Sequence, residues 1–175
     1  MLMQMLAAGG MTMLIDERRE ADEDNPRGYL EYEPVKSLLK DASWLKEARG
    51  KVVKIVAPLL SALPPGLPCR VILSERDLDE VLDSQEKMLA RRGKSQLAAP
   101  ERRKVLRDEY GRTLARVRGM LARRPVTEVL IVEHREAMRD AAGTAEKVNR
   151  FLGGRLDVGS MAAAIDPTLH RNKAS

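Results

Sequence analysis

The chain has 175 residues, of which 43% are hydrophobic and 33% are charged, a balance typical of a single globular domain spanning 1–175 and unlike that of a disordered chain. No run approaches the ~18 apolar residues that a membrane-spanning helix needs. No basic region precedes the apolar start, which disfavours a secretory signal. The sequence therefore predicts a cytoplasmic protein with no membrane partner.

The net charge of +5 predicts an anionic partner, although the same excess also serves solubility. Aromatic residues make up only 3% of the chain, which disfavours nucleic acid as that partner because RNA and single-strand binders stack bases on aromatic rings. The basic runs at 91–94 and 102–104 could steer a smaller anion or simply face solvent. One cysteine, Cys69, excludes an internal disulfide, and two histidines leave few metal ligands, so we expect no metal.

Apolar spacing and turn residues predict alternating helices and strands. Pro34 and Pro100 suit the first turn of a helix, whereas Gly93 and Gly153 suit the residue after a helix end. Short β-branched runs bounded by turn residues are typical of buried strands. In chain order, we expect a helix over 1–8, a strand over 11–15, a loop over 16–28, a helix over 34–48, strands over 51–57 and 70–73, helices over 78–91 and 100–124, a strand over 126–132, a helix over 141–152 and a short helix near 161–165.

Strands that alternate with helices of a dozen residues predict an α/β fold, in which helices cover both faces of a parallel sheet in three layers. Ligands of such sheets bind at the carboxyl ends of the strands. The residues that follow each expected strand are therefore the first candidates for a site.

Arg76 follows the expected strand at 70–73, and Ser84 lies eight residues further on, two turns into the next helix. A guanidinium group and a hydroxyl placed in this way can both reach one phosphate, because phosphate oxygens favour bidentate contacts with arginine. The alternative is that Arg76 pairs with Asp77 or Glu80 and that Ser84 has no such role.

Lys54 lies inside the expected strand at 51–57. An ammonium in a buried strand is costly unless an anion meets it, which makes Lys54 a site candidate. The alternative is that the side chain reaches solvent at the rim of the sheet.

These segments together resemble the sulfotransferases that use 3′-phosphoadenosine 5′-phosphosulfate (PAPS), and more closely their bacterial branch. Segment 76–84 is similar to the family's 3′-phosphate motif, and 54–58 is similar to its strand end of lysine, three residues and proline. Segment 25–31 is similar to the family's Asn-Pro-x-Gly-Tyr-x-Glu loop, and 129–136 with 148–153 is similar to its closing strand and helix. The resemblance covers nearly the whole chain.

The resemblance implies a nucleotide-kinase-like, P-loop NTPase-like sheet and transfer of a sulfuryl group from PAPS to a hydroxyl or amine of an unknown small-molecule or carbohydrate acceptor. It implies that Lys54 stabilises charge on the leaving phosphate and that Arg76 and Ser84 hold the 3′-phosphate. Cytosolic members place a histidine base where this chain has Val56, so Glu31 is the expected base. The alternative for Glu31 is a surface carboxylate.

The sequence departs from the family in one respect: it shows neither the first strand nor the glycine–threonine or glycine–serine phosphate loop that follows it. In the related sheet that strand is central, so its loss would leave two interior strands without a shared neighbour. We therefore expect an N-terminally truncated or degenerate sulfotransferase-like domain that is a poor catalyst. The alternative is a catalytically inactive remnant or an interaction protein of the same fold.

Overall fold

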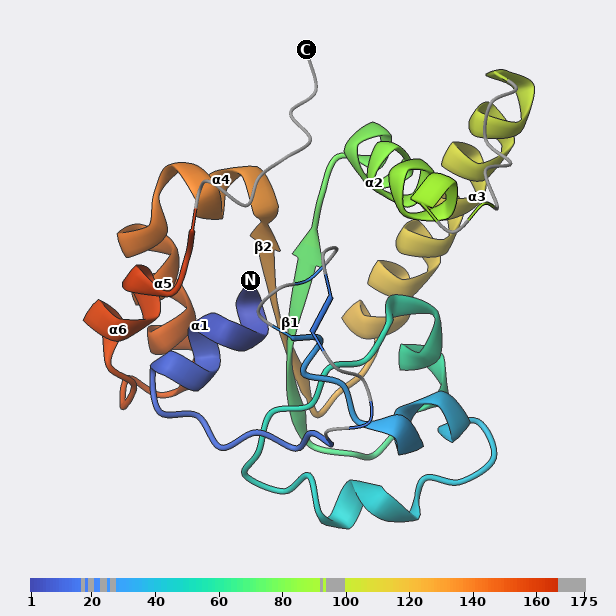
Figure 1. The fold of residues 1–175 in the computed structure, drawn as a ribbon. Helices are drawn as coiled ribbons and strands as arrows, with labels where there is room; N and C mark the ends of the chain where they lie inside the picture. The colour runs from blue at the N-terminus through green and yellow to red at the C-terminus, as the bar shows by residue number, and fades with distance from the viewer. Residues whose placement is uncertain are drawn as a thin grey trace.

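The centre of the structure is a two-stranded parallel sheet with helices on both sides, a mixed α/β arrangement (Figure 1). Strand β1 (Cys69–Glu75) pairs with β2 (Thr127–Glu133) along its whole length. The computed structural model describes residues 1–16, 18, 21–22, 25, 28–91, 93 and 100–166.

The crossover between the two strands consists of α2 (Leu78–Arg91) and α3 (Pro100–Ala122), as parallel pairing requires a long connection. Asp77 begins α2, because its carboxylate accepts the backbone N–H groups of Asp79 and Glu80. The two helices are linked by a 2.9 Å hydrogen bond from the Tyr110 hydroxyl to the Gln85 side chain.

The other side of the sheet is covered by α1 and by the helices that follow β2 (Figure 1). Asp140 and Asp157 begin α5 and α6 as side-chain caps, and Gly153 ends α5 in the left-handed region with φ 107°. Met5 and Met161 are fully buried in the core that these helices form. The bounds are α1 (Leu2–Ala8), α4 (His134–Arg139), α5 (Ala141–Leu152) and α6 (Val158–Ala163).

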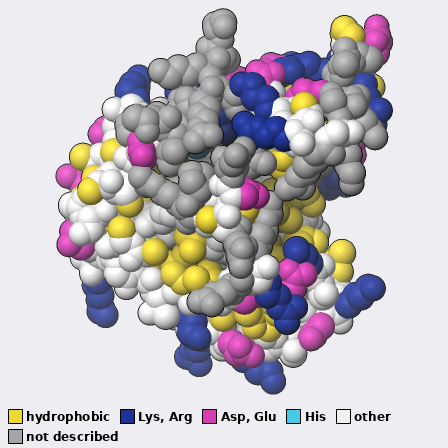
Figure 2. Space-filling view, viewed as in Figure 1, with side chains coloured by type: hydrophobic (Ala, Val, Ile, Leu, Met, Phe, Trp, Pro, Cys, Tyr) yellow, Lys and Arg dark blue, Asp and Glu magenta, His cyan; other side chains and the backbone are white. Residues whose placement is uncertain are grey.

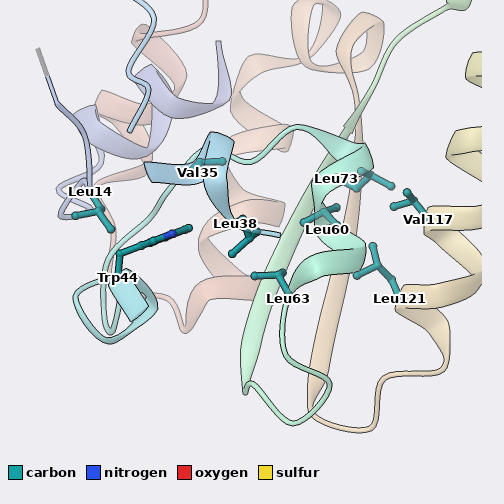
Figure 3. Close-up of a cluster of buried hydrophobic side chains, with 9 residues drawn as sticks. All are labelled: Leu14, Val35, Leu38, Trp44, Leu60, Leu63, Leu73, Val117 and Leu121. Carbon is teal, nitrogen blue, oxygen red and sulfur yellow. The ribbon is translucent and has the colours of Figure 1, made fainter. Parts of the chain in front are cut away.

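A second hydrophobic core lies between β1, α3 and the irregular segments before β1 (Figure 3). Leu73 of β1 and Val117 and Leu121 of α3 are buried there, together with Leu60 and Leu63 from the region of a 3-10 helix, η3 (Ala57–Ala62). The two cores therefore occupy opposite sides of the sheet, and β1 contributes to both.

The sequence expectation of one helix over 34–48 is wrong. The region holds two 3-10 helices, η1 (Glu33–Ser37) and η2 (Ser43–Lys46), because the Asp41 carboxylate accepts the Ser43 backbone N–H and stabilises a turn between them. Leu39 lies between these two 3-10 helices and is 74% exposed.

The expected strands at 11–15 and 51–57 are reduced to a single parallel bridge between Met13 and Val52. Of the expected three-layer sheet, the described residues form one parallel strand pair and one bridge, with helices on both sides. Helix α4, which the sequence analysis did not predict, directly follows β2. Within the described ranges, no helix combines the length and apolar character needed to cross a bilayer.

Candidate functional site

Lys54 and Glu31 lie together, although they are 23 residues apart in the sequence: the Lys54 Nζ is 3.1 Å from Glu31 Oε1. The ammonium also donates to the backbone oxygen of Tyr29 at 3.2 Å and lies 5.9 Å from the centre of the Tyr29 ring. The side chains of Lys54 and Glu31 are 37% and 27% exposed, so the pair is partly open to solvent.

Backbone contacts explain why Glu31 reaches Lys54. The Asp16 N–H donates to the Glu31 carbonyl at 2.9 Å, and the Asp16 carboxylate accepts the Glu33 N–H at 2.6 Å. The latter hydrogen bond is the main reason why the pKa of Asp16 is lowered. These bonds hold the Glu31 segment beside the segment that pairs with Val52, two residues before Lys54.

The chemistry open to this pair follows from its two groups. A carboxylate at hydrogen-bonding distance from a hydroxyl or amine can accept its proton, and a fixed ammonium can stabilise negative charge that develops nearby. The pair thus combines a candidate base with a candidate charge stabiliser.

Arg76 binds Glu80, which confirms the ion pair that the sequence analysis considered as an alternative. Arg76 Nε is 3.0 Å from one Glu80 oxygen, and Arg135 Nη2 is 2.9 Å from the other. Glu80 is 1% exposed. Its hydrogen bond is the main reason why the pKa of Arg135 is raised. Two guanidinium groups thus share one carboxylate at this end of the sheet, where Figure 2 shows basic side chains gathered near the start of α2.

Ser84 lies one turn beyond Glu80 on α2 and is half-buried. The carboxylate that Arg76 contacts therefore comes from the turn between the two residues that were expected to share a phosphate. Glu75, the last residue of β1, is held by Arg118 of α3, whose Nε donates to Glu75 Oε1 at 2.6 Å. This hydrogen bond is the main reason why the pKa of Arg118 is raised, and the pair fixes α3 against the carboxyl end of β1.

A groove of about 1540 Å³ lies between β1 and the segment that carries Lys54. Residues 52–57 line one wall, and the other wall includes most of β1. Of the predicted site residues, Lys54 lines this groove.

Sequence reasoning missed the part played by Arg135 and Glu80. Arg135 lies two residues after β2, so the rule that sites follow strand ends could have singled it out. Glu80 was considered only as a possible partner of Arg76, and its near-complete burial follows from packing that the sequence pattern does not show. Pro26 and Arg27 of the 25–31 motif, and Arg92 and Lys94 of the basic run at 91–94, lie outside the described residues.

Comparisons with family models, with curated proteins and with solved structures found no match to this chain. Among the residues that the structure describes, no three or more His, Cys, Asp or Glu side chains come together in a way that could hold a metal ion.

Proposed function

We propose that this chain is a sulfotransferase-like protein of P-loop NTPase-like fold that binds a 3′-phosphorylated adenosine nucleotide at the carboxyl end of its parallel sheet. The observation that carries the proposal is the contact between Lys54 and Glu31. The resemblance assigned these two residues complementary roles from distant parts of the sequence, and their side chains meet at 3.1 Å.

PAPS would supply the activated sulfuryl group, and an acceptor hydroxyl or amine would receive it. Glu31 takes the acceptor proton, and Lys54 stabilises the negative charge of the departing phosphate. Both roles need side chains that solvent and ligand can reach, and the partial exposure of the pair meets that need.

The chain's residues fit one end of the nucleotide better than the other. Arg76 and Arg135 present two guanidinium groups in one place, which suits a phosphate that can replace or share their contacts with Glu80. Ser84, one turn further along α2, would add a hydroxyl. The resemblance matches no segment to the family's phosphate loop for the 5′ end, so we expect nucleotide binding to be easier to detect than turnover.

Nucleotide binding is tested by thermal denaturation with adenosine 3′,5′-bisphosphate and with AMP, which lacks the 3′-phosphate. A selective rise in Tm with the bisphosphate supports the proposal, because a ligand stabilises the fold that binds it. Arg76→Ala should weaken the bisphosphate by about 1.5–3 kcal/mol. Arg70→Ala is the matched control, since Arg70 forms a 3.1 Å ion pair with Glu128 at the opposite end of β1. An equal response to AMP, or to both variants, contradicts the proposal.

The catalytic part is tested with PAPS and a panel of hydroxyl and amine acceptors. Turnover should fall by about 10²–10⁴-fold in Glu31→Gln, since the amide cannot accept the acceptor proton. The bisphosphate-dependent rise in Tm should remain. Unchanged turnover in Glu31→Gln would assign the base to another residue.

A second candidate is a non-catalytic interaction protein of the same fold. The observation that favours it is the groove beside β1, which is larger than the roughly 300–1,000 Å³ typical of small-molecule sites. A cooperative melt without any response to the bisphosphate would favour this candidate.

A further inference from the structure

Among the residues that the structure describes, the wall of the groove that β1 forms has backbone groups without a backbone hydrogen-bond partner. The Cys69 N–H donates to the Val126 carbonyl at 3.2 Å, and the parallel ladder continues in register from there. Because successive residues of a strand direct their backbone groups to opposite edges, Cys69, Val71 and Leu73 face β2. Arg70, Ile72 and Ser74 direct their N–H and C=O groups into the groove.

The opposite wall shows the same alternation. The Val52 N–H donates to the Thr12 carbonyl at 2.9 Å, and the Val52 carbonyl accepts the Leu14 N–H at 2.8 Å, so the backbone groups of Val52 point away from the groove. Residues 52–57 line the groove opposite β1, and Val56 has an extended backbone, with φ −70° and ψ 140°. Along an extended segment the next residues alternate, which directs the backbone groups of Val53 and Ile55 toward the groove.

Side-chain packing shows that the inward and outward alternation of the two walls matches, as it does for strands of one parallel sheet. Val53 and Ile55 pack on the same core as Val71, on the side of α3, whereas Val52 and Ile72 pack on the core of the other side. On both walls, therefore, the residues whose side chains enter the α3-side core direct their backbone groups the same way across the sheet, which is the direction from the 52–56 segment toward β2. Neighbouring strands of a parallel sheet have this relation, and the groove occupies the place of a strand between them.

The unused backbone groups define what chemistry fits the groove. Only an extended polypeptide offers alternating N–H and C=O groups along both of its edges, and it can satisfy both walls at once. Its side chains would enter the two hydrophobic cores on opposite sides, so it must be apolar at successive positions, as buried parallel strands are. A strand of about seven residues matches the length of β1.

Basic side chains at one end of the groove indicate which residues should precede the inserted strand in the partner's sequence. The exposed Lys46, Arg49 and Lys51 line the groove just before the first wall begins, and Arg70 lines it at the start of β1. Among the described residues that line the groove, Glu128 is the one carboxylate, and it is paired with Arg70. In parallel orientation the amino end of an incoming strand would lie here, where acidic residues complement the basic side chains.

We propose that the groove is a docking site for a partner polypeptide, which inserts an extended and continuously apolar segment, preceded by acidic residues, as a strand parallel to both walls. Arg76 and Glu80 do not line the groove, so this interaction is separate from the proposed 3′-phosphate contacts, whereas Lys54 of the proposed catalytic pair does line it. The docking site gives the interaction-protein candidate a defined surface and a defined ligand chemistry.

The probe is a fluorescent synthetic peptide with three acidic residues followed by seven alternating valine and isoleucine residues. A second peptide carries the acidic residues after the aliphatic run, and a third has N-methylated amides at alternate aliphatic positions. Saturable fluorescence anisotropy is expected with the first peptide. Affinity should fall roughly tenfold when the acidic residues are moved, and binding should be lost when the amides are blocked. Equal affinity of all three peptides, or absence of saturable binding, overturns the proposal.

Substitutions locate the peptide. Ser74→Pro removes an N–H that faces the groove, and Ile131→Pro is its matched control, because Ile131 faces the outer edge of β2 and is exposed. Lys51→Glu should weaken the first peptide, whereas Lys40→Glu, away from the groove, should not. Ser74→Pro should abolish binding, and Ile131→Pro should preserve it. If Ser74→Pro does not fold, the methylated peptide decides the same question on the unchanged protein.

Two further outcomes separate this proposal from its competitors. Arg76→Ala should bind the peptide as the parent protein does, even if the nucleotide proposal fails. Sedimentation should show a monomer that takes up the peptide. A dimer that Ser74→Pro disrupts and the peptide cannot invade would identify a second copy of this chain as the occupant and overturn the proposal.

Discussion

At the scale of single residues, Glu80 neutralises part of the positive charge of Arg76 and Arg135 at the carboxyl end of the sheet. It is buried and accepts hydrogen bonds from two arginines, Arg76 and Arg135, which an incoming phosphate would also need. We predict that Glu80→Gln strengthens bisphosphate binding about three- to tenfold, because a neutral amide competes less well than a carboxylate. The same change should lower the free energy of unfolding by about 1–3 kcal/mol, since a buried group loses charge-assisted hydrogen bonds.

Calorimetric titration and chemical denaturation measure the two effects of Glu80→Gln separately. Glu128→Gln is the control, because Glu128 pairs with Arg70 at the far end of β1 and is largely exposed. Weaker binding in Glu80→Gln would mean that Glu80 positions the arginines for the anion and does not compete with it.

Asp157 gives a pH-dependent contribution to stability. Its carboxylate caps α6, and the hydrogen bond from the Ser160 backbone N–H is the main reason why its pKa lies below the ordinary value near 3.8. A group whose folded pKa is depressed stabilises the fold above its unfolded pKa and loses that contribution as pH falls through the folded pKa. We predict that Asp157→Ala lowers Tm at pH 7 by roughly 2–4 °C.

The control for this cap is Asp157→Asn, which keeps an acceptor but does not titrate. The Tm advantage of the parent over Asp157→Asn should shrink between about pH 5 and pH 2, as the carboxylate takes up its proton. A constant difference across that range would show that the charge of Asp157 does not contribute.

At the scale of elements, the sequence predicted the helices whose ends and apolar face are determined by residues close together in the sequence. The helix predicted over 78–91 is confirmed as α2, and the one over 141–152 as α5, because apolar spacing, an aspartate cap and a terminal glycine agree there. The helix predicted over 34–48 fails because the turn-forming Asp41 outweighs the apolar spacing. The strand predicted over 51–57 forms only a bridge at Val52, since a strand depends on a neighbour that no local pattern supplies.

The junction of α1 with α6 depends on the small size of Gly9. A Cβ added there would lie 2.5 Å from Met161 Cγ and 3.3 Å from Leu156 Cβ, although the φ of −75° at Gly9 suits any residue. We predict that Gly9→Ala lowers the free energy of unfolding by about 1–3 kcal/mol through overpacking. Gly66→Ala is the control, because nothing lies within 4 Å of a Cβ at that position. Chemical denaturation of both variants measures the difference, and equal stability would show that Met161 repacks without cost.

At the scale of the whole molecule, the candidate site was only partly predictable. Lys54 and Glu31 were paired through the roles that a family resemblance implied, since no spacing rule connects residues 23 positions apart. The contacts of Glu80 with Arg76 and Arg135 depend on how α2 and α4 meet β1 and β2, which is a property of the assembled fold. The expectation of two interior strands without a shared neighbour came from the sheet order that the family resemblance implied, and the groove lies between those two segments.

The interrupted sheet predicts an alternating pattern of hydrogen exchange along β1. The N–H groups of Val71 and Leu73 point to β2 and should exchange slowly, whereas those of Ile72 and Ser74 point into the groove and should exchange at least roughly a hundredfold faster. Ile72 is the informative residue, because its side chain packs in a core while its N–H faces the groove. Exchange measured by NMR at single-residue resolution tests this, with the inner and outer edges of β2 as an internal reference. If the slow and fast residues do not alternate, the edge of β1 is already satisfied and the groove cannot accept a strand there.

If they do alternate, adding the acidic–aliphatic peptide should slow the hydrogen exchange of Ile72 and Ser74. The exchange of Val71 and Leu73 should stay unchanged, because only Ile72 and Ser74 gain new hydrogen-bond partners.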